Sequence, residues 1–390
     1  MKRNVVLLSC SMALGMSSAP VIVLLGGIVG VALAPNPSLS TLPGAMMVVG
    51  VALFTVPAAL IMRRTGRRKG FMAASLLAAL ACVIGIYAIH IQSFVLFCTV
   101  AFLIGGNLAF VQQYRFAAAE SVEPVHVSRA VSIVLLGSVV AAFIGPELAK
   151  HTREMLPDGL YSGSFASLAA LNLANINLLF FLKEPRTRKE KLAGDERPLG
   201  MVIRQPLYLT AVMVALVAYG VMSFIMTATP VSMHVIDDFF IEATAWVIQS
   251  HVMAMFIPSL FTGFLIGRYG LTKVMLGGIA LMTFCVALAL VDRHFIHYWV
   301  GLVLLGVGWN FLFIGGTTLL TRCYSPAERF KAQAVNEFTV FGFQALASLS
   351  AGTVIFMAGW EVVNGLNLPL LLAMFYVIWK LRSQINRETS

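Results

Sequence analysis

Two pairs of side chains with soft metal-ligating atoms lie close together in the sequence. Met222 and Met226 form an M-x-x-x-M pair, and His251 and Met255 form an H-x-x-x-M pair. Because residues four positions apart share one face of a helix, each pair can point two ligands in one direction. Thioether sulfur and imidazole nitrogen suit Cu(I) better than they suit hard cations. The spacing therefore predicts a copper site if two helices bring the pairs together.

Apolar packing is the competing explanation for the same residues. The chain contains 19 methionines, and methionine commonly fills gaps between apolar helices. The M-x-x-x-M pair alone is therefore more typical of a packing face than of a ligand pair. His251 weighs more, because an ionisable side chain inside an apolar segment is costly and usually functional. Met253 lies two positions from His251 on another face, so it serves as an internal control.

The elements that position these residues are predicted to be membrane-spanning helices. Hydrophobic residues make up 59% of the 390 residues and charged residues only 11%, whereas soluble domains have about half and about a quarter. Apolar runs of about 20 residues recur along the whole chain, which predicts an all-α polytopic membrane protein. We expect twelve transmembrane helices, at 5–33, 43–62, 70–90, 93–115, 129–149, 164–182, 207–233, 244–266, 272–291, 296–320, 333–357 and 362–381.

Basic residues fall on one side of this predicted topology. With a cytoplasmic N-terminus, 24 of the 27 Lys and Arg lie in segments that face the cytoplasm, as the positive-inside rule requires. We therefore expect both termini to be cytoplasmic. The net charge of +10 is then a topology signal, and no nucleic-acid partner is expected. No signal peptide is evident, which fits a bacterial inner membrane, and the spread of the five cysteines predicts no disulfide framework.

The chain divides into two related halves. The longest polar stretch, 183–206, separates an N-terminal half at 1–182 from a C-terminal half at 207–390 that carries the Met/His pairs. Such a stretch is typical of a solvated linker. Gly66 matches Gly270 at an offset of 204 residues. Repeated six-helix halves are typical of secondary transporters, whose substrate site lies between the halves. We therefore expect a transporter and no enzymatic activity.

The members of the two Met/His pairs lie at matching distances from the outer ends of the predicted spans seven and eight, which agrees with a shared site. The predicted span seven ends near Met233, and span eight begins near Thr244. At about 1.5 Å per helical residue, the inner member of each pair lies at one level of the membrane and the outer member at another. If the two spans touch, the four side chains form two layers in the outer half of the membrane.

The basic turns that follow spans two and eight resemble the motif G-x-x-x-D-R-x-G-R-R/K of the major facilitator superfamily. Arg63 and Gly267 stand where the motif has its aspartate, and Ala59 replaces the first glycine in the first copy. The resemblance covers all twelve spans and implies the major facilitator fold. The residues that match, and that the resemblance marks as a conformational-switch motif, are Arg64, Gly66, Arg67, Arg68, Gly263, Arg268 and Gly270.

The Met/His pairs resemble the mark of the CcoA-type copper importers, a branch of this superfamily. The segment 308–338 is also similar to the region between spans ten and eleven of that branch. The resemblance implies that copper, as Cu(I), is the substrate and that no cofactor is permanently bound. It further implies import by alternating access to supply a cytoplasmic copper chaperone and cytochrome oxidase assembly, by a protein that we expect to be a monomer. The residues it marks as ligands are Met222, Met226, His251 and Met255.

An organic-solute carrier is the main alternative, because members of the branch that lack the Met/His pairs transport riboflavin. Aromatic stacking side chains are then expected in the central cavity. The candidate cavity residues are Asn107, Phe110, Trp309, Asn310 and Phe313. Of these, Asn107 and Asn310 occupy matching positions in the two halves and suit helix–helix hydrogen bonding. A non-transporting sensor or oxidase assembly partner is a third alternative, but the chain has no added signalling domain.

Two further groups of residues are candidates for function. Cation collection at the outer mouth is one interpretation of Met233, His234, Asp237 and Asp238, and a solvated loop is the other. Glu337 lies near the cytoplasmic end of span eleven. It is a candidate proton-coupling group, and an ion pair with Arg329 or Lys331 is the alternative.

Overall fold

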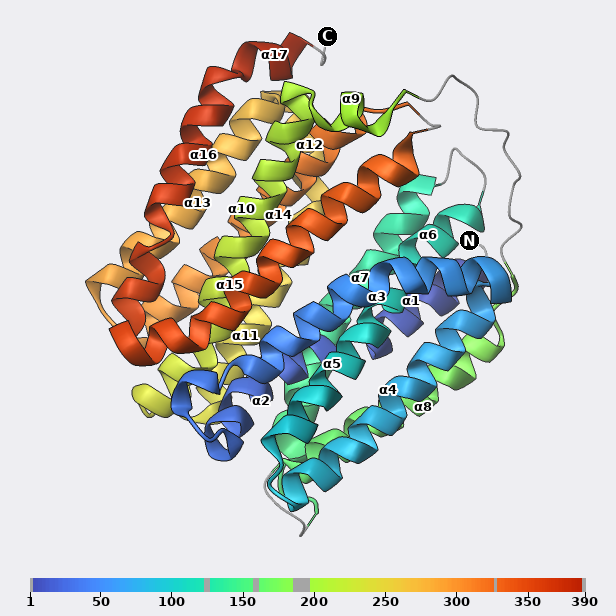
Figure 1. Cartoon of the computed structure of the whole chain (residues 1–390), viewed down its shortest axis with the longest axis vertical. Coiled ribbons are helices and arrows are strands. Elements are labelled where there is room, and N and C mark those ends of the chain that lie inside the picture. Colours follow the sequence, from blue (N-terminus) through green and yellow to red (C-terminus); the bar gives the residue numbers. More distant parts are fainter. Residues whose placement is uncertain (1–2, 123–126, 157–160, 185–196, 326–327, 388–390) are drawn as a thin grey trace.

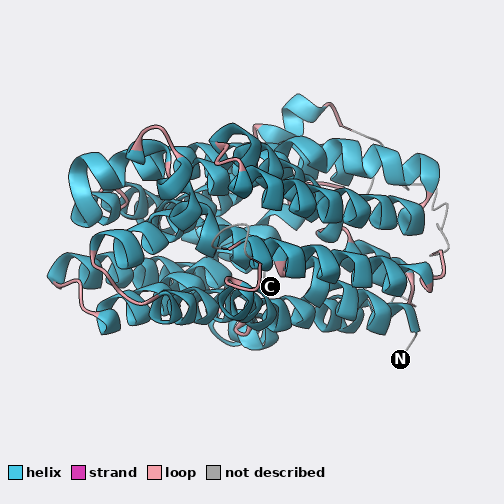
Figure 2. Ribbon diagram, turned by 90° about the horizontal axis from the view of Figure 1, so that it is seen from below, coloured by secondary structure: helices cyan, strands magenta, loops and turns pink. Residues whose placement is uncertain are grey.

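A computed structural model describes residues 3–122, 127–156, 161–184, 197–325 and 328–387. Helices make up the described chain, which contains no strand (Figure 2). The helices are α1 (Arg3–Met16), α2 (Ser18–Leu33), α3 (Leu42–Thr65), α4 (Arg67–His90), α5 (Phe94–Val111), α6 (Tyr114–Glu120), α7 (Val127–Thr152), α8 (Ser162–Phe180), α9 (Leu199–Ile203), α10 (Pro206–Pro230), α11 (Ile241–Phe256), α12 (Ser259–Tyr269), α13 (Leu271–Val291), α14 (Phe295–Thr321), α15 (Arg329–Gly365), α16 (Leu368–Lys380) and α17 (Arg382–Arg387). Two short turns, the 3-10 helix η1 (Pro37–Leu39) and the π-helix η3 (Val231–Ile236), join them.

The helices agree with the predicted twelve-span topology. By length and composition, ten described stretches can cross a membrane, and the bent pair α11 and α12 makes an eleventh. One of the ten, Lys331–Lys380, contains both α15 and α16. These two helices run in opposite directions away from their junction (Figure 1), and the chain leaves helical geometry near it, at Gly359, where φ is +81°. Counted separately, they supply the predicted spans eleven and twelve.

Several spans are interrupted where the sequence weakens the helical hydrogen bonds. Span eight bends by 45° between α11 and α12, at Pro258, which has no backbone N–H to donate to the preceding turn. Pro230 ends α10 in the same way, and a π-helical turn follows it. Span one divides at Ser17, whose hydroxyl donates to the Ala13 carbonyl at 2.7 Å. These breaks make the lining of the space between the halves irregular.

The turns predicted to be repeated have the same backbone geometry in both halves. Gly66 joins α3 to α4 with φ +88° and ψ 158°, and Gly270 joins α12 to α13 with φ +87° and ψ 152°. Only glycine adopts this region without strain. The offset of 204 residues therefore identifies a true structural repeat. We call the end of the bundle that carries these turns the basic end, because the motif arginines lie there.

The linker is attached at both ends to the helix turns of the basic end. Glu184 accepts hydrogen bonds from the backbone amides of Arg67 at 3.2 Å and Arg68 at 3.0 Å. It thereby caps the N-terminus of α4, where a carboxylate is stabilised by the helix dipole. This copy of the motif has Arg63 in place of the motif aspartate. Arg197 donates to Glu328 through Nε at 2.7 Å. Most of the predicted linker, 185–196, lies outside the described residues.

Arg197 and the Ser325 amide hold the pKa of Glu328 well below its usual range. A carboxyl with a lowered folded-state pKa stabilises the fold above its ordinary pKa, and that contribution is lost as the pH falls through the lowered value. This attachment of the linker therefore persists throughout the neutral range.

The halves meet along a long interface (Figure 1). In that view α1 to α8 form one group and α10 to α16 the other. Contacts between the groups join α3 to α15, α7 to α11 and α2 to α10. At the end opposite the basic end, η1 packs against α15, and any side chain larger than hydrogen at Gly352 would collide with Thr41. The halves are therefore closely packed at that end.

Replacing Gly270 with alanine isolates the backbone requirement at the repeated turn. A Cβ at Gly270 meets no atom within 4 Å, so the change adds only backbone strain, about 1–3 kcal/mol. We expect Gly270→Ala to lower the melting temperature of the detergent-purified protein. The control is Gly267→Ala, which lies inside α12 and also meets nothing. Alanine should be neutral or slightly stabilising there, and equal melting temperatures for the two variants would contradict the account.

Candidate functional site

A cavity of about 390 Å³ lies between the halves, within the range of sites for small organic ligands. It extends to Thr321 and Tyr324 near the basic end. A smaller compartment of about 140 Å³ adjoins it toward the opposite end and reaches Gly27 and Thr41. Met222 and Met255 line both spaces, so the two form one continuous hollow.

An aromatic cluster forms the wall of the larger cavity on the C-terminal side. Trp309 and Phe313, one helical turn apart on α14, stack at 4.8 Å between ring centroids with an interplanar angle of 10°. Tyr219 of α10 meets both rings edge-on, at 5.1 and 5.7 Å. Phe256 of α11 and Phe341 of α15 extend the cluster. Four helices thus place aromatic surface against one space, which suits a flat, apolar-faced ligand.

Polar atoms without protein partners face the same cavity. Trp309 is only 3% exposed, and its Nε1 has no hydrogen-bond partner in the described chain. Gln344 donates from Nε2 to Ser223 Oγ at 2.7 Å, while its Oε1 has no partner. Buried polar atoms are usually satisfied, so these atoms are free to bind a solute.

The smaller compartment is rich in thioethers from both halves. Met222 and Met226 of α10 and Met255 of α11 line it from one side, and Met16 and Met47 line it from the other. The structure therefore brings three of the four predicted copper ligands to one space. The described lining contains no histidine, cysteine or acidic side chain.

His251, the fourth predicted ligand, is directed elsewhere. It is fully buried, and its Nδ1 lies 2.7 Å from the Leu302 carbonyl oxygen of α14. A hydrogen bond at this atom makes Nδ1 the donor. A Cβ at Gly306 would lie 2.7 Å from the His251 carbonyl oxygen, so α11 and α14 are in close contact here. The imidazole thus lies in a helix–helix interface, with Nε2 unpartnered among the described residues.

The arrangement of the helices explains why the four ligands do not meet as two layers. Both α10 and α11 pack along α14, more extensively than against each other. The methionines face the cavity, whereas the histidine faces α14. The condition stated for a two-layer site, that spans seven and eight touch, is met only to a small extent, because α14 lies against both helices.

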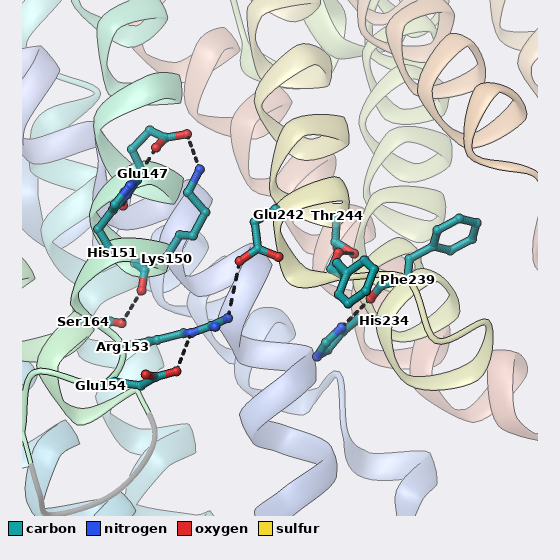
Figure 3. Close-up of polar contacts among 12 residues, drawn as sticks. Glu147, Lys150, His151, Arg153, Glu154, Ser164, His234, Phe239, Glu242 and Thr244 are labelled. Atoms are coloured by element: carbon teal, nitrogen blue, oxygen red, sulfur yellow. Dashed lines mark hydrogen bonds and ion pairs between the residues drawn. The ribbon is translucent and has the colours of Figure 1, made fainter.

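The predicted outer vestibule is divided among local contacts at the end opposite the basic end. Met233 is fully buried, and His234 Nδ1 lies 2.7 Å from the Phe239 carbonyl oxygen (Figure 3). Asp237 accepts from Tyr298 at 2.7 Å and lies 3.5 Å from Arg293. In this conformation the four residues do not converge on a collecting site, because only Asp238 among them is exposed.

Polar contacts join the two halves beside this region. Arg153, next to the end of α7, lies 3.7 Å from Glu242 of α11 (Figure 3). Gln249 of α11 donates to Glu147 of α7 at 3.1 Å. Both contacts hold α11 against α7, so they favour the conformation in which this end is closed.

Three of the five predicted cavity residues lie outside the cavity lining. Asn310 donates to the Met255 carbonyl at 2.7 Å and accepts from Thr262, so it joins α14 to α11 and α12. Asn107 is fully buried. Phe110 packs in an apolar cluster near Gly70. Their helix faces point away from the cavity, and Trp309 and Phe313 alone among the five line it.

Glu337, the predicted coupling residue, lines the larger cavity, as does Arg115 of the opposite half. The motif residues Arg64, Arg67 and Arg68 lie at the basic end beside Gly66, and Arg268 lies beside Gly270. Gly263 is inside α12, where a Cβ would meet nothing within 4 Å. The motif thus surrounds the turns that join α3 to α4 and α12 to α13, at a distance from the aromatic cluster.

Comparison with known proteins decides the family. The family model described as Major Facilitator Superfamily matches residues 6–241 and 238–390. The chain belongs to this superfamily. It is 42% identical to the riboflavin transporter RfnT of Brucella anthropi over 372 residues, covering 95% of this chain and 93% of that protein. It is 27% identical to an uncharacterized MFS-type transporter, YddS, of Bacillus subtilis, covering 87% of this chain and 82% of that protein.

Two solved transporter structures share the fold at low sequence identity. The nucleoside transporter NupG superposes with a TM-score of 0.73 at 14% identity, covering 96% of this chain and 99% of that one. The human organic anion transporter TETRAN superposes with a TM-score of 0.72 at 12% identity, covering 97% of this chain and all of that one. These likenesses support a multi-pass membrane protein with the fold of a secondary transporter.

Several residues that line the cavity could not be predicted from the sequence. Nothing in the neighbouring sequence distinguishes them from residues that pack between helices. Met16, Met47, Tyr219 and Phe341 lie in uniformly apolar spans, where cavity-facing and packed positions have the same composition. Arg115 is one of the 24 basic residues that indicate topology, because it lies near the end of a predicted span.

Replacing His251 tests whether it acts in packing or as a ligand. Because it is buried between α11 and α14, we expect His251→Ala to destabilise the metal-free protein by about 1–3 kcal/mol, as for other buried hydrogen-bonded groups. The measurement is thermal unfolding in detergent, with and without Cu(I). Met253→Ala is the control on the same helix. A His251→Ala variant that unfolds like the wild type without copper, but loses stabilisation by copper, would contradict the packing role.

Proposed function

We propose that this superfamily member transports riboflavin, or a solute with a similar flat aromatic ring system, across the membrane by alternating access. The stacked Trp309–Phe313 pair, surrounded by Tyr219, Phe256 and Phe341 in a cavity of about 390 Å³, carries this proposal. The 42% identity to a riboflavin transporter over nearly the whole chain supports it. The role of the cluster is to supply aromatic surface for one ring and unpartnered polar atoms for its edge.

The closed end and the cavity support a proposal for the step of the transport cycle that this conformation represents. Contacts at Arg153–Glu242 and Glu147–Gln249 hold the halves together at one end, while the cavity extends toward the basic end. With the basic end cytoplasmic, as the positive-inside rule predicts, this is an inward-facing state. We propose a bacterial inner-membrane location with both termini in the cytoplasm, and function as a monomer in the bilayer.

Copper transport is the second candidate, and one observation favours it. Five methionines from both halves line the compartment next to the aromatic cavity, and thioether sulfur suits Cu(I). In this proposal Met222, Met226 and Met255 hold the ion, joined by Met16 or Met47 in place of His251. Delivery to a cytoplasmic chaperone for cytochrome oxidase assembly belongs to this proposal alone.

One pair of variants separates the two candidates in cells. The host is a riboflavin auxotroph that lacks its own flavin and copper importers. The variants are Trp309→Ala, which removes the centre of the aromatic cluster, and Met226→Leu, which keeps apolar volume but removes a sulfur. Riboflavin-dependent growth and cellular copper by mass spectrometry are measured for each.

For a riboflavin transporter, Trp309→Ala should reduce uptake at limiting riboflavin about tenfold or more, since base–aromatic stacking in other proteins is worth about 1–3 kcal/mol. Met226→Leu should grow like the wild type. For a copper importer, Met226→Leu should abolish the copper gain. A wild-type protein that supports no growth on limiting riboflavin overturns the flavin proposal, and one that raises cellular copper establishes the second candidate.

A further inference from the structure

Two opposite charges face the larger cavity from different halves of the molecule. Arg115, in the first turn of α6, lies on the N-terminal side, and Glu337 of α15 lies on the C-terminal side. Among the described lining residues they are the one basic and the one acidic side chain. The cavity wall therefore carries no net charge.

Neither charged group forms an ion pair with a residue that the structure describes. Arg115 Nε is buried without a hydrogen-bond partner among the described residues, and its guanidinium carbon lies 4.9 Å from the centroid of the Phe116 ring. Both side chains line the same cavity, from opposite halves of the molecule. Charged groups within a membrane are costly unless they pair or face a cavity with a ligand, so both groups are available to a solute.

The charges border the aromatic cluster. Both line the same cavity as Tyr219, whose ring contacts Trp309 and Phe313 edge-on. The Trp309 Nε1, unpartnered on a residue 97% buried, adds a donor to the same wall. A flat ring against the cluster thus meets donors from Arg115 and Trp309 and an acceptor from Glu337.

This set of groups discriminates between solutes by charge. A neutral ring whose edge carries both carbonyl oxygens and N–H groups satisfies Arg115 and Glu337 together. An anionic solute is attracted by Arg115 and repelled by Glu337, so the two effects oppose each other. The free-energy cost of removing the anion from water is then not offset by a favourable net charge in the cavity. Specificity of this kind depends on the repulsive group as well as on the attractive one.

We propose that Arg115 and Glu337 form a charge-balanced pair that selects a neutral flat ring with a mixed donor and acceptor edge and excludes its phosphorylated form. This selectivity rests on the proposed flavin function, and it specifies that the cavity binds the unphosphorylated form of the substrate. Arg115 donates to ring carbonyls, and Glu337 accepts from a ring N–H and repels an anionic tail.

Flavin fluorescence tests this directly, because stacking on aromatic side chains quenches it. The full chain is purified in detergent and titrated with riboflavin and with riboflavin 5′-phosphate. We expect the wild type to bind riboflavin at least about tenfold more tightly. Glu337→Gln removes the repulsion and leaves Arg115 unbalanced, so the preference should fall about tenfold or reverse. Arg115→Gln should weaken both ligands, and the phosphate more. A tenfold change corresponds to about 1.4 kcal/mol.

Two matched controls change charge away from the cavity. Asp292→Asn removes an exposed carboxylate but keeps the side-chain oxygen that accepts from the Arg293 amide. Lys273→Gln removes an exposed cation on α13. Both should bind the two flavins like the wild type. If Glu337→Gln does not purify as a folded protein, Arg115→Gln carries the test.

The outcomes separate the inference from the function on which it rests. A wild type that binds neither flavin contradicts the proposed function. A wild type that binds riboflavin and its phosphate equally, or a folded Glu337→Gln variant with an unchanged preference, overturns the charge selection but leaves flavin transport standing.

Discussion

A polar group inside an apolar helix bundle must find a partner in the protein or face a space that a solute or water can fill. Several intramembrane polar residues follow this constraint, whereas Asn107 is fully buried and both of its amide atoms lack a partner among the described residues. Asn310 uses its amide to join α14 to α11 and α12, and His251 uses Nδ1 to bind the α14 backbone. Arg115, Glu337 and Trp309 Nε1 instead face the cavity. The contacts of Asn310 and His251 join helices within the C-terminal half, whereas Arg115, Glu337 and Trp309 Nε1 remain available to a solute.

The same constraint shows how two functions could be inferred from one chain. The Met/His spacing satisfies a ligand pattern in sequence, but helix neighbours decide which side chains share a space. Because α14 lies against both α10 and α11, the methionines line the hollow while the imidazole is held in an interface. The methionine compartment and the aromatic cavity are nevertheless continuous, so the proposals concern adjacent parts of one pathway.

Much of the fold could be predicted from the sequence, because a helix that crosses lipid needs a long apolar run, and such runs are visible in the sequence. Apolar length gave the spans, and the glycines at 66 and 270 gave the repeat, which their shared backbone geometry confirms. The site was less accessible to prediction. Trp309 and Phe313 were identified, but Tyr219 and Phe341 have the same composition around them as packed residues. Helix rotation, which decides whether Phe110 packs or lines the cavity, depends on all neighbours together.

The most direct test of the central claim is uptake of riboflavin by liposomes that contain only the purified protein. The account predicts saturable flavin accumulation without ATP, competed by unlabelled riboflavin and unaffected by a Cu(I) chelator. Liposomes that take up Cu(I) but no riboflavin would contradict it, and would assign the transport pathway to the methionines instead of the aromatic cluster.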